Sequence, residues 1–340
     1  MFTRNRIYPI ILIILVFVVW KIRQNAVKGE RVSFNGQTMG TYYNIIYLHP
    51  DGEVFKKEVD SLLEIWNQSL STYIDNSEIS RFNRNNELVF ESPYFYPVLK
   101  KSQEIFEITG GAFDPTVMPL VNAWGFGPEE REMPDSSEVE RLKKLVNFNY
   151  IAFDTLHVWK KKPGVQLDFS AIAKGYGVDV VGAFLSGKGI KNYLVDIGGE
   201  ITCKGINDRG TSWTTGIEDP LVQFNERKIV AIIEVSNKAI ATSGNYRNFY
   251  IKEGKKYAHT ISPYTGYPVQ HSLLSATVIA DDCMTADGFA TAFMVLGVDP
   301  SIQILDDHPE LDAYFIFSDD QGRMSTFMTE GFKAILQEEV

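Results

Sequence analysis

Strand patterns follow one another through the second half of this 340-residue chain, with only two helical patterns among them. They are short runs rich in β-branched and aromatic residues, separated by turn residues. Strands that succeed one another without regular helical crossovers pair as antiparallel neighbours, whereas a parallel sheet needs a crossover at each step. The sequence therefore predicts an α+β fold with a mixed or antiparallel sheet and argues against a doubly wound one. The strands are expected at 165–169, 192–204 (two strands that meet at Gly198-Gly199), 213–218, 228–235, 275–280 and 313–317.

Helical spacing of apolar residues predicts most of the remaining elements. One expected helix begins near Ser170, a good N-cap, and ends around Ser186-Gly187. Another runs from Cys283 to Leu296, with Asp281-Asp282 as its cap and Gly297 closing it. The first half is expected to contain a tether at 29–36, a strand at 37–48 and helices at 54–70, 97–109 and 135–145, the last N-capped by Asp135 or Ser136.

The N-terminus has the layout of a targeting segment. Arg4 and Arg6 precede Ile7–Trp20, fourteen almost entirely apolar residues that would span roughly 21 Å as a helix, less than the ~30 Å hydrocarbon core of a bilayer. That length fits the apolar region of a signal peptide, yet no small-x-small cleavage site follows. We therefore expect residues 1–28 to be an uncleaved signal anchor and tether, with a cleaved peptide as the alternative, and residues 29–340 to be the globular domain.

Charge is unevenly distributed along the chain, whose formal net charge is −10. Residues 1–28 hold five basic side chains and no acidic ones, which leaves 28 basic against 43 acidic residues, or −15, for the remainder. Nucleic-acid binding needs clustered Lys and Arg, so it is not expected here. An anionic ligand could bind to such a body only where a metal ion or helix N-termini neutralise it.

Cys203 and Cys283 are the only cysteines. Both lie in apolar stretches, where buried free thiols are common, although two cysteines of an exported protein could also pair. We expect free thiols. The absence of a CxxC motif or a Cys/His cluster argues against a zinc site.

Asp287 and Thr291 form the first candidate site. Four residues apart on the expected helix Cys283–Leu296, they share one helical face, and their alanine neighbours leave room for a ligand. A carboxylate and a hydroxyl are hard oxygen donors of the kind that suits Mg²⁺. The spacing alone favours the alternative, a solvated Asp and a Thr that bonds back to its own helix.

Asp168 forms a second candidate site, because it ends an expected strand directly before a helix that carries Lys174 in its first turn. The N-terminus of a helix presents N–H groups and a positive dipole end to anions. The spacing matches neither a P-loop nor a G-x-G-x-x-G motif. The alternative is that Asp168 is only a structural cap.

Two turn-rich loops add further candidates. His259 opens a loop rich in Pro and Gly that could hold its imidazole as a general base or a phosphate donor, although a lone loop histidine is also often structural. Gly110-Gly111 precedes Phe113 and Asp114, and either Phe113 or Tyr73 could stack on a flat ring.

Taken together and in this order, these segments resemble the flavin transferase family called ApbE. The similarity covers nearly all of residues 37–297, so chance agreement is improbable. The matching stretches are Thr38-Met39-Gly40-Thr41, Leu70-Ser71-Thr72-Tyr73, Gly111-Ala112-Phe113-Asp114-Pro115, Asp168–Tyr176, Asp196-Ile197-Gly198-Gly199-Glu200, Ala241-Thr242-Ser243-Gly244, His259–Gly266 and Ala286-Asp287-Gly288-Phe289-Ala290-Thr291-Ala292.

The resemblance implies a T-fold-like α+β architecture that holds FAD between two lobes. It implies His259 as the catalytic residue. By the same analogy, Mg²⁺ is bound by Asp287 and Thr291 and by main-chain oxygens at Ala171 and Ala290. The residues expected to contact FAD are Met39, Tyr73, Ala112, Phe113, Asp114, Asp168, Lys174 and Ile261.

The reaction implied by the resemblance cleaves the FAD pyrophosphate, attaches FMN to a Ser or Thr hydroxyl of another protein and releases AMP. The expected acceptor is a flavoprotein subunit of a membrane redox complex, on the periplasmic side of a bacterial inner membrane. Two alternatives stay open: an FAD pyrophosphatase, in which water replaces the hydroxyl, and an FAD-binding assembly protein without catalysis.

Overall fold

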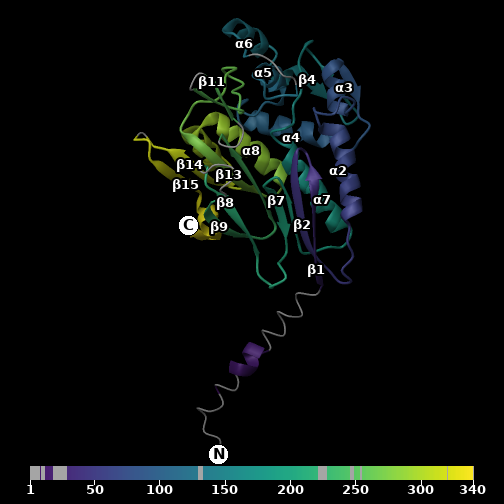
Figure 1. Cartoon of the computed structure of the whole chain (residues 1–340), viewed down its shortest axis with the longest axis vertical. Coiled ribbons are helices and arrows are strands. Elements are labelled where there is room, and N and C mark those ends of the chain that lie inside the picture. The colour runs from purple at the N-terminus through teal and green to yellow at the C-terminus, as the bar shows by residue number, and fades with distance from the viewer. Residues whose placement is uncertain are drawn as a thin grey trace, which may run out of the picture.

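An eight-stranded sheet forms the centre of the protein (Figure 1). Every neighbouring pair of its strands is antiparallel, which confirms the expected α+β class. This computed structural model describes residues 8, 12–17, 29–128, 133–220, 228–245, 249–252, 255–319 and 321–339. In spatial order the strands are β1 (Glu30–Thr38), β2 (Thr41–His49), β6 (Tyr193–Ile197), β7 (Glu200–Lys204), β10 (Lys238–Gly244), β13 (Leu273–Ala280), β14 (Asp312–Ser318) and β15 (Met324–Met328).

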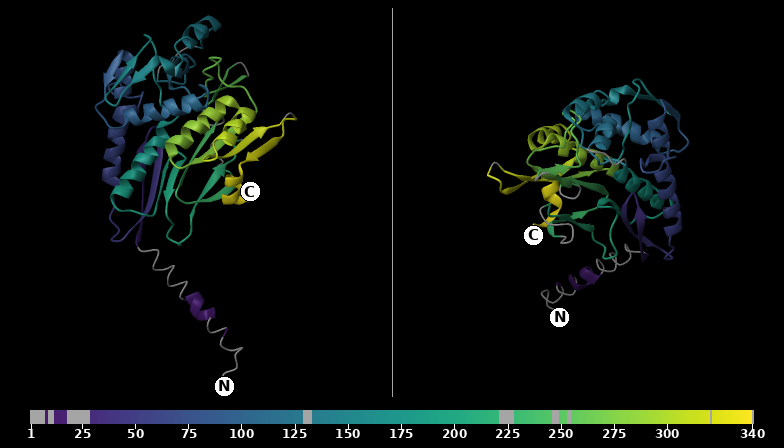
Figure 2. Two further views of the ribbon diagram at one scale, coloured as in Figure 1. Left: turned by 180° about the vertical axis from the view of Figure 1, so that it is seen from behind. Right: turned by 45° about the horizontal axis from the view of Figure 1, so that its top comes forward.

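Helices cover one face of this sheet, and a small three-stranded sheet covers the other (Figure 2). The alternation of side chains along each strand serves both layers: in β13, Val278 packs among the helices and Ile279 against the small sheet. The main helices are α2 (Lys56–Leu70), α4 (Phe95–Ile108), α7 (Ala173–Gly187) and α8 (Cys283–Leu296), and the small sheet has the order β16 (Leu336–Glu339), β9 (Ile229–Val235) and β8 (Trp213–Glu218).

The remaining elements are short and lie around these layers. A second three-stranded sheet has the order β3-β5-β4, and β11 pairs with β12. Their bounds are α3 (Glu78–Arg84), β3 (Glu87–Val89), η2 (Pro115–Val117), α5 (Met118–Ala123), α6 (Ser136–Lys143), η3 (Phe148–Tyr150), β4 (Ile151–Phe153), β5 (His157–Lys160), β11 (Phe249–Lys252), β12 (Lys255–Ala258), α9 (Val298–Asp307) and α10 (Glu330–Ile335).

Helices α7 and α8 approach each other closely at Gly175. Its N–H donates to Asp287 Oδ2 at 2.9 Å, and a Cβ at this position would lie 2.2 Å from the carbonyl oxygen of Cys283. Below this contact, the carboxylate of Asp179 on α7 accepts hydrogen bonds from the N–H groups of Cys283 and Met284, at 2.9 and 2.8 Å. The first turn of α8 is thus held by a side chain of α7, as well as by its own N-cap.

The hairpin of β1 and β2 differs from the expectation of one strand at 37–48 preceded by a tether at 29–36. Strand β1 begins at Glu30, because Val32 and Phe34 alternate inward as buried core residues. The two strands are joined by Met39 and Gly40, whose φ values of 50° and 69° give the twist that a two-residue hairpin turn needs. The expectation was wrong because an apolar alternation continues through this turn.

The expected strand at 165–169 does not form. Instead, the side-chain amide of Asn83 accepts from Leu167 N at 2.7 Å and donates to Leu167 O at 2.8 Å, in place of a neighbouring strand. Helix α7 begins at Ala173 and not near Ser170, since the Ser170 hydroxyl donates to Asp168 and does not cap the helix.

Most other expected elements are confirmed. The helix after Asp281-Asp282 has Asp282 as its N-cap and ends at Gly297, whose φ is 80°. Asp135 caps α6, and the two strands around Gly198-Gly199 are β6 and β7. The expected helices at 54–70 and 97–109 are α2 and α4, and the strands expected at 213–218, 228–235, 275–280 and 313–317 are β8, β9, β13 and β14.

The expected anchor at 1–28 falls largely outside the described residues. Of this segment the structure describes Tyr8 and residues 12–17, which are helical. Among the residues described, no helix has the length and apolar character needed to cross a membrane.

Both cysteines are free and buried, as expected. The thiol of Cys203 faces the carbonyl oxygens of Val235 and Lys238, each at 3.5 Å, and Cys283 faces that of Ile240 at the same distance. Burial raises the pKa of Cys203 to about 11 and also raises that of Cys283. Neither thiol is therefore a reactive nucleophile.

Gly175→Ala should destabilise the fold, because the new methyl group would overlap the carbonyl of Cys283. We expect the free energy of unfolding to fall by about 1–3 kcal/mol. Gly187→Ala is the matched control on the same helix, since a Cβ added there would meet nothing within 4 Å and its stability should be unchanged or slightly higher. Urea unfolding compares the two, and equal stability would contradict the close packing described.

Asp179→Asn should change how stability depends on pH. Burial raises the pKa of Asp179 from 3.8 to about 7, so between about pH 4 and 7 the folded state keeps a proton that the unfolded state releases. The contribution of this group to the free energy of unfolding therefore falls as pH rises through that window. Asparagine cannot ionise, so the variant does not lose this contribution as pH rises. Urea unfolding at pH 5 and pH 8 should therefore show that the free energy of unfolding of the variant, relative to that of the parent protein, is higher at pH 8 than at pH 5. The exposed Asp307→Asn should show no such gain; a pH-independent difference for Asp179→Asn would refute the assignment.

Candidate functional site

A cleft of about 1060 Å³ opens between the helical layer and the segment that carries α5 and the loop after β12. Helix α2, the β1–β2 turn, the start of α7 and one face of α8 form one wall. The structure brings together in this cleft twelve of the thirteen residues that the sequence nominated: Met39, Tyr73, Ala112, Phe113, Asp114, Asp168, Ala171, Lys174, His259, Ile261, Asp287 and Thr291.

Ala290 is the nominated residue that does not line the cleft. Its side chain is fully buried in the main hydrophobic core among residues of α8 and the sheet. The oxygen nominated at this position belongs to the main chain, so a metal contact at Ala290 stays a prediction.

Lys174 lies between two buried carboxylates at the floor of the cleft. Its Nζ is 2.7 Å from Glu200 Oε1 and 3.9 Å from Asp287 Oδ1, and the two acids are only 3% and 2% exposed. Burial alone would lower the pKa of Lys174, but the two carboxylates outweigh it and hold that pKa above its usual value. Burial raises the pKa of Asp287 to about 7.

This cluster lacks one positive charge. Two carboxylates face one ammonium, and Glu200 Oε2 is buried without a hydrogen-bond partner among the described residues. A buried charge without full compensation is costly, which is why Asp287 keeps a proton up to about pH 7, and a cation or a donor would stabilise its ionised form. The sequence argument missed Glu200: it lies in the segment 196–200 of the resemblance, but only the folded hairpin of β6 and β7 brings it to Lys174.

The donor set beside the cluster fits a hard cation. On α8, the hydroxyl of Thr291 lies 3.4 Å from the carbonyl oxygen of Ala171 and 3.1 Å from Ser243 Oγ, one helical turn from Asp287. No group of three or more His, Cys, Asp or Glu side chains that could hold a metal occurs in the described part of the chain. These oxygens could therefore hold Mg²⁺ only with further ligands from water or from phosphate oxygens of a substrate, which is the usual way of binding this ion.

Asp168 and Asp114 are both held by local hydrogen bonds. Asp168 Oδ1 accepts from Ser170 N at 2.8 Å and from the Ser170 hydroxyl at 2.6 Å, and burial raises its pKa. Asp114 accepts from Thr116 N, the Thr116 hydroxyl and Phe148 N, and burial raises its pKa to about 6. Asp114 is thus foremost the N-cap of η2.

The helix N-terminus that was expected to bind an anion near Ser170 lies further along the chain, and two of its N–H groups already have hydrogen-bond partners. The helix starts at Ala173, whose N–H donates to Phe169 O at 2.7 Å. The N–H of Gly175 donates to Asp287. The main positive group at this helix end is therefore the ammonium of Lys174.

Aromatic side chains line the opposite part of the cleft. Tyr73 is 67% exposed at its mouth, whereas Phe113 is buried in its wall. Trp66 on α2 also lines the cleft, and its indole Nε1 is buried without a hydrogen-bond partner among the residues described. Trp66 was not nominated from the sequence, and its ring belongs to the main hydrophobic core although it also borders the cleft.

The loop that carries His259 is tied to both sides of the cleft. Trp124 Nε1 donates to Gly266 O at 2.8 Å, and the Tyr264 hydroxyl lies 3.3 Å from the carbonyl oxygens of Thr109 and Gly110. The imidazole of His259 lies edge-on to Phe126, with ring centroids 6.5 Å apart. These contacts hold a titratable ring at the cleft surface with little freedom.

Comparisons with known proteins agree with this geometry. The ApbE family model matches residues 39–315. Proteins named FAD:protein FMN transferase from Vibrio cholerae and Haemophilus influenzae are each 39% identical to this chain, over 91% and 90% of it and over 93% and 92% of their own lengths.

Solved structures are similar over almost the same range. The flavin transferase ApbE from Vibrio cholerae is 37% identical with a TM-score of 0.81, covering 90% of this chain and 99% of that protein. The apo flavinyl transferase ApbE from Pseudomonas stutzeri is 31% identical with the same TM-score, covering 92% of this chain and 99% of its own. With a matching family model, relatives and fold, this chain belongs to the ApbE family.

Proposed function

We propose that this protein transfers the FMN part of FAD to a hydroxyl group of a target protein and releases AMP. The observation that carries the proposal is the cleft itself: a buried cluster short of one positive charge, a fixed histidine and aromatic walls meet in a single cavity of about 1060 Å³. FAD offers the matching chemistry, with a flat ring system and a pyrophosphate. Relatives at 39% identity carry the name of this activity.

FAD is proposed to lie along the cleft with its flat rings against the aromatic wall. Met39, Tyr73, Ala112, Phe113 and Ile261 offer apolar or aromatic surface, and the buried Trp66 N–H offers a donor. The residues proposed to contact its polar parts are Asp114, Asp168 and Lys174.

The chemistry needs positioning and charge stabilisation more than covalent help from the protein. The acceptor oxygen forms a bond to the phosphorus of FMN while the bond from that phosphorus to the bridging oxygen breaks, so that AMP leaves with this oxygen. His259 takes the proton of the attacking hydroxyl and passes it to solvent. A bound Mg²⁺ would neutralise pyrophosphate charge, and Asp287, Thr291 and the Ala171 carbonyl would hold it.

The acceptor is proposed to be a flavoprotein subunit of a membrane redox complex, with a Ser or Thr in an Asp-x-x-Ser/Thr-Gly-Ala-Ser/Thr sequence. The apolar run Ile7–Trp20 supports an N-terminal membrane anchor and a position on the periplasmic side of a bacterial inner membrane. The reaction would then occur in the compartment that the acceptor faces.

His259→Ala should lower the rate of flavin transfer about 100-fold or more while FAD still binds, because a positioned proton acceptor typically contributes that much. The full chain is incubated with FAD, Mg²⁺ and an acceptor subunit, and mass spectrometry follows FMN on the acceptor and free FMN in solution. His157→Ala, at an exposed position of β5 outside the cleft, is the matched control and should react like the parent protein.

Two results would overturn the proposal. Free FMN and AMP without flavin on the acceptor would identify a pyrophosphatase. Unchanged flavinylation by His259→Ala, with FAD binding intact, would remove the catalytic role of His259 and favour a binding or assembly protein.

Asp287→Asn should raise the Mg²⁺ concentration needed for half-maximal transfer about tenfold or more, since it removes the only charged side chain of the proposed metal site. Asp281→Asn removes the same charge just before α8, at a side chain that is 80% exposed, and should leave the Mg²⁺ dependence unchanged. The metal assignment fails if Asp287→Asn titrates with Mg²⁺ like the parent protein.

A further inference from the structure

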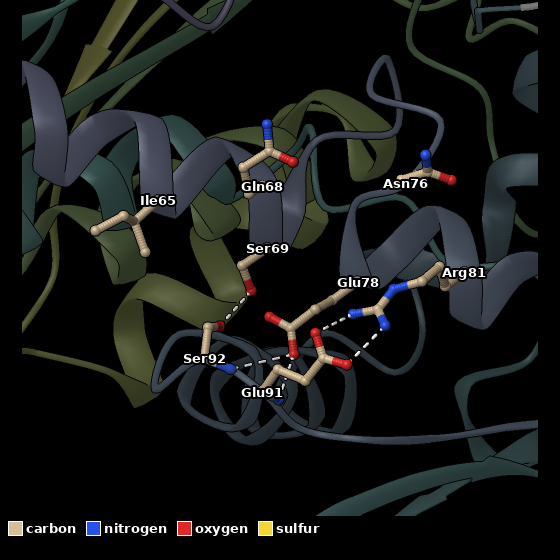
Figure 3. Close-up of a pocket in the computed structure, with 8 residues that line it drawn as sticks. All are labelled: Ile65, Gln68, Ser69, Asn76, Glu78, Arg81, Glu91 and Ser92. Carbon is tan, nitrogen blue, oxygen red and sulfur yellow. Dashed lines mark hydrogen bonds and ion pairs between the residues drawn. The ribbon is translucent and has the colours of Figure 1, made fainter.

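A second cavity, of about 380 Å³, lies behind the segment that joins α2 to α3 (Figure 3). Its walls are the last turns of α2, helix α3 and the residues just before α4. None of its lining residues lines the large cleft. The two cavities are separated by α2 and the segment 71–77, which contribute different residues to each.

Glu78 is the distinctive group in this cavity, because it is a carboxylate only 3% exposed. Its Oε1 accepts hydrogen bonds from the N–H groups of Glu91 and Ser92, at 2.7 and 3.3 Å. Its Oε2 is buried and has no hydrogen-bond partner in the described part of the chain. In Figure 3 this second oxygen points away from the two N–H groups and toward Ser69.

The nearest cation, Arg81, compensates Glu78 only in part, because it interacts with Glu78 through space while its hydrogen bonds go to Glu91. Arg81 makes a two-pronged ion pair with Glu91, at 2.7 and 2.6 Å, so its charge is already matched. The Arg81–Glu91 pair is neutral as a unit, which leaves one negative charge in the cavity on Glu78. Arg81 Nε is itself buried without a partner among the described residues.

The other walls supply neutral acceptors and a small apolar surface. The hydroxyls of Ser69 and Ser92 lie 2.7 Å apart, and the side-chain amides of Gln68 and Asn76 also line the cavity. Ile65 is 54% exposed at its edge. One carboxylate with hydroxyl and amide oxygens is too weak a set for a divalent metal, while the net negative charge excludes an anion.

We propose that this cavity binds a primary ammonium group with an alkyl stem. Such a group carries one positive charge and three N–H donors, which match the free oxygen of Glu78 and the neighbouring hydroxyl and amide oxygens. The stem would lie against Ile65. The same chemistry can come from a free amine or from a lysine side chain of a protein, and the site is independent of the proposed transferase reaction.

The probes are n-butylamine, Nα-acetyl-lysine methylamide and, as a neutral isostere, n-butanol. Binding to the full chain is measured without FAD by calorimetry and by saturation-transfer NMR. Glu78→Gln is the sharpest variant, because its amide oxygen can keep the two backbone hydrogen bonds while an NH₂ group replaces the free oxygen. Glu87→Gln removes the same charge from an exposed position of β3 outside the cavity and serves as the control.

We expect the ammonium probes to bind the parent protein and Glu87→Gln equally, and Glu78→Gln at least about tenfold more weakly, with n-butanol not binding. Thermal unfolding of Glu78→Gln verifies that the fold is intact. Tighter binding of the lysine amide supports a protein lysine as the source, and tighter binding of n-butylamine supports a free amine. No ammonium binding, equal binding of n-butanol, or undiminished binding by a folded Glu78→Gln would each overturn the proposal.

Discussion

The contact between α7 and α8 is the constraint on which the rest of the site depends. Because Gly175 has no side chain, the helices approach until its N–H reaches Asp287, and this brings Lys174 beside the same carboxylate. The β6–β7 hairpin then adds Glu200 from the sheet. A helix pair held further apart would leave Asp287 open to water, where a carboxylate has no need of a partner and little influence on a ligand.

Burying the charged groups at the floor of the cleft costs folding free energy. Asp287 and Glu200 are taken out of water and share one ammonium, that of the partly exposed Lys174, which opposes folding. The cores on both faces of the eight-stranded sheet offset that cost, since they bury large side chains such as Phe293, Phe315 and Phe332. The stability of the fold therefore comes from the hydrophobic cores on the two faces of the sheet, whereas the charged groups available for binding lie at the contact between α7 and α8.

Sequence reasoning succeeded where local rules decide the outcome. The boundaries of α8 follow from its acidic cap and closing glycine, and the cluster of nominated residues follows from the resemblance. It failed at 165–169, where Asn83, more than eighty positions away, replaces a strand partner. Glu200 and Trp66 escaped notice for a similar reason: the pairing of Glu200 with Lys174 and the burial of the Trp66 indole N–H without a described partner are set by tertiary contacts that no local pattern encodes.

The last turns of α2 separate two cavities, with Trp66 and Asn67 on one side and Gln68 and Ser69 on the other. A displacement of this part of α2 caused from one cavity would therefore change the wall of the other. Thermodynamic linkage makes any such influence reciprocal: an occupant of the small cavity that changes affinity in the large cleft must have its own affinity changed by the same factor. The last turns of α2 are thus a physical route by which two chemically unrelated ligands could become coupled.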